Sequence, residues 1–266
     1  MDAAQLQSGI NDRFEAAMLA IAARADAAER DPQGLESEVA LLAKVGILTA
    51  CLPANYGGKG LATSPEASVT LFDVLRRIGQ ANLSLGRLFE GHVNAVKLVS
   101  LYGGATALDE MSRVVSKGGL LGVWGANGRK PLRYMAARGT YRLSGEKIFA
   151  SSLGLMRLAV VTMHASETPD TRPQLALIEV TEKRRQDASH WDATGMKATM
   201  SGRFDFSDMC VSDAHCLGEP GIYEGEPHFE GASGAIARCI LAWLKHCCAI
   251  GETCFFPVGA SMILFS

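Results

Sequence analysis

The segment from Thr140 to Ser152, TYRLSGEKIFASS, gives the strongest evidence for the predicted fold. Apolar and polar residues alternate before Ser144-Gly145, as in a half-buried strand, and the apolar pattern resumes after this pair. The Ser-Gly pair is a turn signal. We therefore expect a hairpin that presents the ring of Phe149 and the hydroxyls of Ser151 and Ser152 at the mouth of a sheet.

Short apolar runs separated by turn residues continue on both sides of this segment, and no helical pattern interrupts them. The runs are Leu120–Trp124, Leu132–Ala137, Leu155–His164, Gln174–Val180 and Arg203–Phe206. Strands in this arrangement are typical of an antiparallel barrel or sandwich. The sequence therefore predicts an antiparallel β-barrel domain at residues 118–231. It contains no Gly-x-Gly-x-x-Gly or P-loop motif for binding a nucleotide phosphate.

Helical periodicity fills the chain before Gly118, so we expect an N-terminal α-helical domain at residues 1–117 and the fold class α+β. The expected helices cover residues 32–45, 65–79, 83–101 and 106–116. The first two follow N-cap and proline pairs, Asp31-Pro32 and Ser64-Pro65.

Composition excludes several classes of protein. The formal net charge is −2 and no basic stripe is present, so we expect no nucleic-acid partner. Asp12 and Glu15 make the N-terminus unlike a signal peptide, which has an unbroken apolar centre. No apolar run elsewhere reaches the ~18 residues of a membrane span. We therefore expect a cytoplasmic protein without a membrane span. Cysteine and histidine spacings predict no metal site, and we expect His92 to be packed or solvent-facing rather than catalytic.

Residues of the opening segment fit the pattern L-x-G-x-K-x-W-I-(T/S)-(N/S). They are Leu143, Gly145, Lys147 and Phe149-Ala150-Ser151-Ser152, with phenylalanine in the place of tryptophan. In these positions the chain resembles the FAD-dependent acyl-CoA dehydrogenases, whose aromatic and hydroxyl residues line the isoalloxazine ring. The resemblance implies that Phe149, Ala150, Ser151 and Ser152 bind FAD.

The loop after the first predicted strand departs from that family. The family usually has T-E-P-x-x-G-S-D, whereas this chain has Gly125-Ala126-Asn127-Gly128-Arg129-Lys130-Pro131 after Trp124. The resemblance implies that Trp124, Gly125 and Ala126 approach the flavin edge. Because Gly125 replaces the threonine and no Ser-Asp pair follows, the usual flavin hydrogen bond and the usual CoA contact are both in doubt. A plain surface turn is the alternative at this position.

Two further segments match the family in the expected order. Leu52–Gly60 resembles the LPxxYGGxG signature, and its proline and glycines predict a loop. Gly195–Ser201 resembles G-(M/L)-(R/K)-x-(T/S)-x-(S/T), and Val211–Gly218 keeps the frame of the following segment without its proline. Several matches in one order make the resemblance stronger than any one of them.

The resemblance stops near Ala232, where the family begins its C-terminal four-helix bundle. Residues 232–266 form a short atypical tail that is Cys-rich and nearly uncharged after Arg238. One hypothesis is a frameshift, because codons for Gly231–Cys254 can be chosen that encode a family-like helix in another frame. The other is a genuine hydrophobic tail that binds a partner. The family's catalytic glutamate belongs to this bundle, so we name no catalytic residue.

The resemblance implies an FAD-dependent oxidoreductase that binds a small-molecule substrate. The main interpretation is α,β-dehydrogenation of an acyl-CoA or related thioester, with hydride transfer to FAD. A flavin-dependent monooxygenase of the same fold is one alternative, because some relatives use reduced flavin and oxygen. The other is a truncated, inactive remnant or an interaction subunit. The family commonly forms homo-oligomers, so a homo-oligomer is expected as well.

Overall fold

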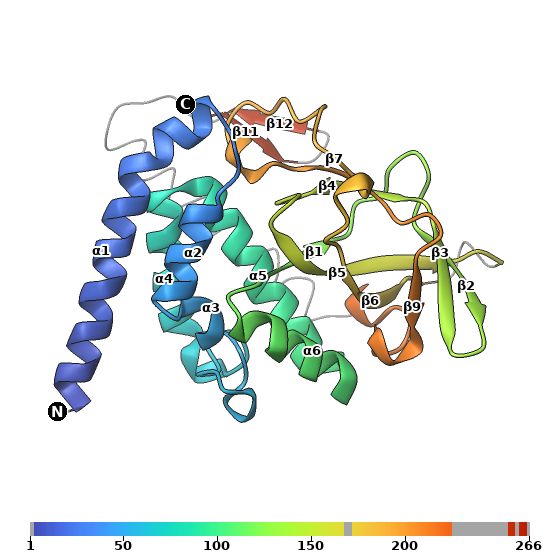
Figure 1. Cartoon of the computed structure of the whole chain (residues 1–266), viewed down its shortest axis with the longest axis horizontal. Helices are drawn as coiled ribbons and strands as arrows, with labels where there is room; N and C mark the ends of the chain where they lie inside the picture. Colours follow the sequence, from blue (N-terminus) through green and yellow to red (C-terminus); the bar gives the residue numbers. More distant parts are fainter. Residues whose placement is uncertain (1–2, 168–171, 225–254, 259–260, 265–266) are drawn as a thin grey trace.

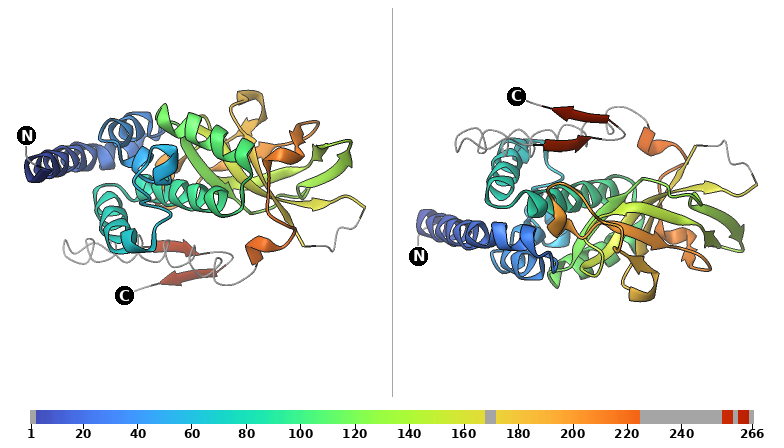
Figure 2. Two further views of the ribbon diagram at one scale, coloured as in Figure 1. Left: turned by 90° about the horizontal axis from the view of Figure 1, so that it is seen from below. Right: turned by 90° about the horizontal axis from the view of Figure 1, so that it is seen from above.

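A computed structural model of the protein describes residues 3–167, 172–224, 255–258 and 261–264. Helices fill one end of the molecule and most of the strands the other, while β11 and β12 lie beside the helices (Figure 1). The two views of Figure 2 show α1 reaching furthest from the β region. Among the described residues, the structure contains no helix with the length and hydropathy of a membrane span.

Six α-helices precede the first strand in the described chain. They are α1 (Ala3–Arg30), α2 (Glu36–Lys44), α3 (Ile47–Ala50), α4 (Ser68–Ala81), α5 (Leu83–Tyr102) and α6 (Ala105–Ser116). Helices α4, α5 and α6 confirm the predicted ones to within about three residues, a normal uncertainty for helix ends. The predicted start of α2 at Asp31-Pro32 is wrong, since Gly34 takes φ +95°, a conformation that interrupts a helix.

The strands are short, and most of them match the predicted runs. They are β1 (Leu120–Trp124), β2 (Arg133–Ala137), β3 (Thr140–Ser144), β4 (Glu146–Ala150), β5 (Met156–Ala165), β6 (Gln174–Glu179), β7 (Gln186–Asp187), β8 (Gly202–Asp205), β9 (Cys210–Ser212), β10 (Cys216–Leu217), β11 (Phe255–Val258) and β12 (Ser261–Leu264). The predicted tail, residues 232–266, lies outside the described residues apart from β11 and β12, which pair antiparallel.

Two sheets form a barrel-like β region that is mostly antiparallel. The larger has the order β10-β6-β5-β2-β3-β9, with β1 also on β5, and the smaller has the order β4-β8-β7. The prediction of an antiparallel barrel needs one correction, because β1 and β2 each pair with β5 in parallel. This is possible because β1 and β2 both join β5 through long connections that leave the sheet and return.

The predicted hairpin of the opening segment is wrong. β3 pairs with β2 and β9, whereas β4 pairs with β8 in the other sheet, so the chain crosses between sheets at Gly145. Gly145 has φ +105°, and its carbonyl oxygen accepts a hydrogen bond from Phe206 N at 2.9 Å. A turn signal between two apolar runs is common to a hairpin and to a change of sheet, so the pattern alone does not separate them.

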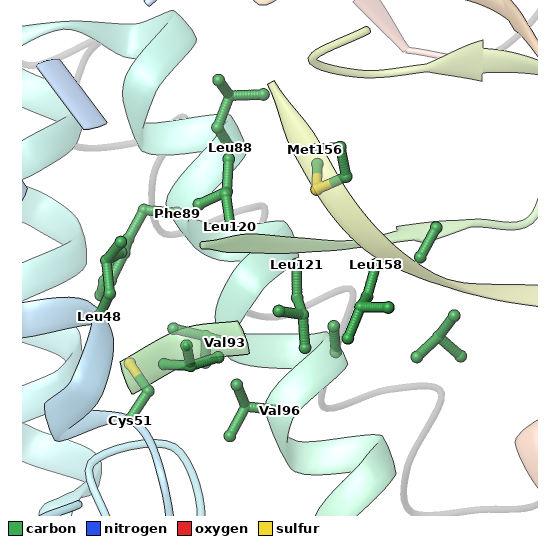
Figure 3. Packing of buried hydrophobic residues seen from close by; sticks show 14 of the residues in the cluster. Leu48, Cys51, Leu88, Phe89, Val93, Val96, Leu120, Leu121, Met156 and Leu158 are labelled. Carbon is green, nitrogen blue, oxygen red and sulfur yellow. The ribbon is translucent and has the colours of Figure 1, made fainter. Parts of the chain in front are cut away.

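One hydrophobic core runs through the helical and the β regions. Side chains from α3, α5, β1 and β5 point toward one another in this core, as Leu48, Val93, Leu121 and Leu158 show in Figure 3. All four are at most 2% exposed. The division of the chain into domains at residues 117 and 231 stays a prediction.

His92 is packed where the helical and the β regions meet. Of the two expectations for this residue, packed or solvent-facing, the first is correct. Its Nε2 donates to the Leu48 carbonyl oxygen at 3.2 Å, and its Nδ1 accepts from Leu121 N at 3.3 Å. The ring thus joins α3, α5 and β1 in its neutral form. Complete burial lowers the pKa of His92 to about 4.

Replacement of Gly145 tests the crossing between sheets. An added Cβ would lie 2.3 Å from the Pro131 carbonyl oxygen, and φ +105° is strained for any other residue. We expect Gly145→Ala to lower the free energy of unfolding by roughly 2–4 kcal/mol in chemical denaturation. Gly104→Ala is the matched control, because Gly104 has no heavy atom within 4 Å of a new Cβ; as the N-cap of α6 it should lose no more than about 1 kcal/mol. Equal effects of the two changes would contradict the assignment.

Protonation of His92 should make the fold acid-sensitive. The pKa of His92 is about 4 in the folded protein and about 6.5 in the unfolded chain, so only the unfolded chain binds the proton between these values. The free energy of unfolding should therefore fall by roughly 2–3 kcal/mol as the pH drops from 6.5 to 4. His92→Gln should remove most of this slope in denaturation curves, whereas the exposed His190→Gln should keep it. A slope that survives in His92→Gln would refute the assignment.

Candidate functional site

A groove of about 850 Å³ opens beside the smaller sheet. Its walls include Phe149 from β4, Trp191 from the segment after β7, and Ser201 and Arg203 from the start of β8. Aromatic rings with a few polar groups are the usual lining of a site for a flat organic ligand. The groove is therefore the candidate binding site.

Phe149 presents its ring to the groove because the backbone of β4 is irregular there. The register between β4 and β8 shifts between Lys147 and Ala150, and Phe149 takes φ +53°, which is rare for a bulky residue. Its side chain is 62% exposed and meets Trp191 edge to face, with ring centroids 6.5 Å apart. An exposed aromatic ring held in a strained backbone is a common feature of ligand sites.

Trp191 forms part of the same wall, but its indole nitrogen is not open to the groove. Its Nε1 is buried and has no hydrogen-bond partner among the described residues. A buried N–H without an acceptor costs about 1–3 kcal/mol, and a bound water is one group that satisfies such a donor.

Three hydroxyl groups form a row at the edge of the groove. The Ser201 hydroxyl donates to Ser151 Oγ at 3.1 Å, and Ser201 Oγ lies 2.9 Å from Thr199 Oγ1. The turn that carries them is anchored from a distance, because Glu29 of α1 accepts a hydrogen bond from Lys197 N at 2.7 Å. Helix α1 therefore helps to place Ser201.

Lys147 holds the Gly125–Asn127 loop from beneath. Its ammonium is 2.8 Å from the Gly125 carbonyl oxygen, 2.8 Å from Asn127 Oδ1 and 2.7 Å from Thr162 Oγ1. The residue is 0% exposed, and burial lowers the pKa of Lys147 to about 7. This loop is thereby tied to both β4 and β5.

A smaller cavity of about 210 Å³ is lined mainly by α5, together with Val123 of β1 and Gly125. Glu90 on its wall is 1% exposed, and its carboxylate is 2.6 Å from Arg87 Nη1 and also accepts from Asn94. Burial raises the pKa of Glu90, while Arg87 and Asn94 act in the opposite direction. Tyr223 also lines this cavity.

The seven residues predicted to bind a cofactor lie along two adjacent segments, and their side chains differ in access. Phe149 lines the groove, Gly125 lines the smaller cavity, and the Ala126 carbonyl oxygen accepts from Ile148 N at 3.0 Å. Ser151 is half-buried. Buried side chains belong to Trp124, Ala150 and Ser152.

Burial corrects one expectation for these residues. Ser152 is 3% exposed, so its hydroxyl is not presented at the mouth of a sheet as the hairpin prediction required. Trp124 packs on Phe204 with ring centroids 5.6 Å apart. The role of all seven residues in cofactor binding stays a prediction.

The sequence did not single out Trp191 and Ser201 as site residues. Ser201 ends the Gly195–Ser201 match and Trp191 lies four residues before it, so this match was the available signal. Their place in the groove depends on the pairing of β4 with β8, which the hairpin prediction missed. In the described part of the chain, no group of three His, Cys, Asp or Glu residues has an arrangement that could hold a metal ion.

Comparison with known proteins gives relatives of one functional class. The chain is 28% identical over 214 residues to dibenzothiophene monooxygenase of Rhodococcus erythropolis, covering 75% of this chain and 49% of the relative. It is 28% identical over 190 residues to the enzyme of the same name from Mycolicibacterium goodii, covering 66% and 43%. The chain spans about half the length of these curated relatives. No protein-family model matches the chain.

Solved structures agree on the fold. FMN-bound TdsC from Paenibacillus sp. A11-2 superposes with a TM-score of 0.75 at 21% identity, covering 89% of this chain and 62% of that one. Butyryl-CoA dehydrogenase from Megasphaera elsdenii gives 0.73 at 15% identity, covering 90% and 67%. The described helices and strands therefore have the acyl-CoA dehydrogenase fold.

Proposed function

We propose that this chain is the flavin-binding part of a flavin-dependent monooxygenase that acts on a small organic molecule. The observation that carries the proposal is a groove of about 850 Å³ whose wall holds the exposed ring of Phe149 edge to face with Trp191. A flavin ring has a flat apolar face that stacks on such an aromatic wall.

The residues that would hold the flavin come from three segments. Phe149 offers a face for stacking, Trp191 adds a second aromatic side chain to the wall, and Ser151 ends the hydroxyl row. The Gly125–Asn127 loop offers backbone groups without a large side chain in front of them. When bound, flavin supplies the electron transfer and oxygen chemistry that no side chain can supply. FAD is the predicted form, and the FMN-bound TdsC neighbour makes FMN the form to compare with it.

Monooxygenation is better supported than the α,β-dehydrogenation that the sequence favoured. The curated relatives from R. erythropolis and M. goodii, which match 75% and 66% of this chain, are both dibenzothiophene monooxygenases. The loop at Gly125–Pro131 also lacks the family's usual CoA-binding serine. A small aromatic heterocycle is the substrate class we propose, because dibenzothiophene monooxygenases act on one and a TdsC structure contains indole. Acyl-CoA binding and a homo-oligomer stay predictions.

Loss of the Phe149 ring should weaken flavin binding. We expect Phe149→Ala to raise the Kd for FAD and FMN about tenfold, since one stacked ring contributes about 1–2 kcal/mol. Titration of the full chain, followed by flavin fluorescence and the visible spectrum, measures this change. Met135→Ala is the control, because Met135 is an exposed apolar side chain, 57% accessible, outside the groove. An unchanged Kd in Phe149→Ala would show that the flavin does not bind in this groove.

A product assay separates the two oxidoreductase activities. The full chain is supplied with reduced flavin and oxygen, and with dibenzothiophene or indole as the substrate, and products are analysed by mass spectrometry. We expect a product that has gained one oxygen atom. In parallel, butyryl-CoA is offered with a dye as electron acceptor. Dye reduction by butyryl-CoA without any oxygenated product would overturn the monooxygenase proposal in favour of dehydrogenation.

A further inference from the structure

Lys147 is a buried cation whose three protons are all donated to neutral acceptors. The acceptors are the carbonyl oxygen of Gly125, the amide oxygen of Asn127 and the hydroxyl oxygen of Thr162, each within 2.8 Å of Nζ. Buried lysines are rare unless they are paired with a carboxylate, because removing an ammonium from water is costly.

No counter-ion compensates this charge among the described residues in contact with it. The neighbouring Glu146 lines the groove on the opposite face of β4 and pairs with Arg203 at 3.0 Å. On β8 the register partner of Lys147 is Phe204, which is fully buried. The loop and β5 contribute only the carbonyl, amide and hydroxyl groups named above. The interior beneath the loop is therefore electropositive whenever Lys147 is protonated.

The position of this charge connects it to the proposed flavin site. Ile148 and Phe149 follow Lys147 on β4 and line the groove, while Gly125, which accepts from Lys147, lines the smaller cavity. The Gly125–Asn127 loop therefore reaches the smaller cavity at Gly125, while Gly128, the residue that follows it, lines the groove, and the ammonium holds the loop at Gly125 and Asn127. Charge near a flavin ring is one of the means by which a protein tunes its electronics.

We propose that the Lys147 ammonium fixes the Gly125–Asn127 loop and makes the site prefer reduced, anionic flavin over oxidised, neutral flavin. This inference rests on the proposed flavin function and deepens it. Two electrons and one proton convert the neutral ring into an anion, and an uncompensated buried cation stabilises that anion in a site of low dielectric constant. Lys147 is a positioning and electrostatic residue in this proposal.

Reduction of the flavin should in turn change the pKa of Lys147. Burial brings the pKa of Lys147 to about 7 in the flavin-free protein, so part of the population is neutral at physiological pH. A nearby anion favours the protonated amine, so reduction of the flavin should raise the pKa of Lys147. The protein then takes up an additional proton at Nζ on reduction, between the two pKa values.

The test is the midpoint potential of flavin bound to the full chain, measured by dye-coupled redox titration at several pH values. Lys147→Met keeps the side-chain length and removes the charge. We expect its preference for reduced flavin to fall at least tenfold, which lowers the potential of a two-electron couple by about 30 mV. Lys130→Met removes an exposed charge from the same loop and should leave the potential unchanged.

Two further variants keep the test decisive if Lys147→Met is unstable. Asn127→Asp retains the lysine and adds a counter-ion at the position 2.8 Å from Nζ, so it should lower the potential in the same direction. Thr162→Val removes one acceptor of the ammonium and so disfavours the protonated amine, and it should lower the potential in the same direction by less than Asn127→Asp does. The pKa of Lys147, followed by NMR of its ε-methylene group, should be higher in the reduced than in the oxidised protein.

Each outcome has one meaning. Lower potentials in Lys147→Met and Asn127→Asp, with an unchanged control, support the inference. If the wild type binds flavin and neither variant changes its potential, the inference fails while the proposed function stands. If the wild type binds no flavin, both are overturned, and measurement of flavin binding before the redox titration distinguishes this case.

Discussion

The packing of α5 against β1 and β5 is the constraint on which the rest of the structure depends. Thirteen of the twenty residues of this helix are buried, so it is enclosed on nearly every side. A helix in such a place must satisfy each polar group that it carries into the core. His92 does so by bonding to the backbone of α3 and β1, and Glu90 does so through Arg87 and Asn94. The helical and β regions are therefore held together by the core and by polar contacts.

The groove follows from how the chain leaves that core. β3 belongs to the large sheet and β4 to the small one, and the step between them at Gly145 turns β4 toward β8. The irregular register of β4 then exposes Phe149, while Lys147 on the same strand points inward and holds the Gly125–Asn127 loop. A single strand thus supplies the apolar surface of the candidate site on one side and its charge on the other.

Much of the fold could be predicted from local patterns. Helices α4 to α6 and strands β1 to β6 follow from periodicity and turn residues, because each pattern reflects contacts within a few residues. Pairing depends on contacts between distant segments, so the parallel partners of β5 and the change of sheet at Gly145 could not be derived in this way. The site divides similarly: the spacing around Phe149 indicated an aromatic wall, but Trp191 joins it only through the fold. The motif contained Lys147, but the sequence assigned it no role, because its burial is visible only in the folded structure.

The hydrogen bond from Lys197 N to Glu29 gives the N-terminal helix a second task besides packing. Glu29 lies in the last turn of α1, and the turn that it holds contains Met196 and Met200, both with φ above +40°. Left-handed residues of this kind relax to other conformations when their anchor is removed. Helix α1 consequently holds in place the turn that bears Ser201. Removal of α1 would then loosen the groove wall at Ser201, although Glu29 and Lys197 are 168 residues apart in the sequence.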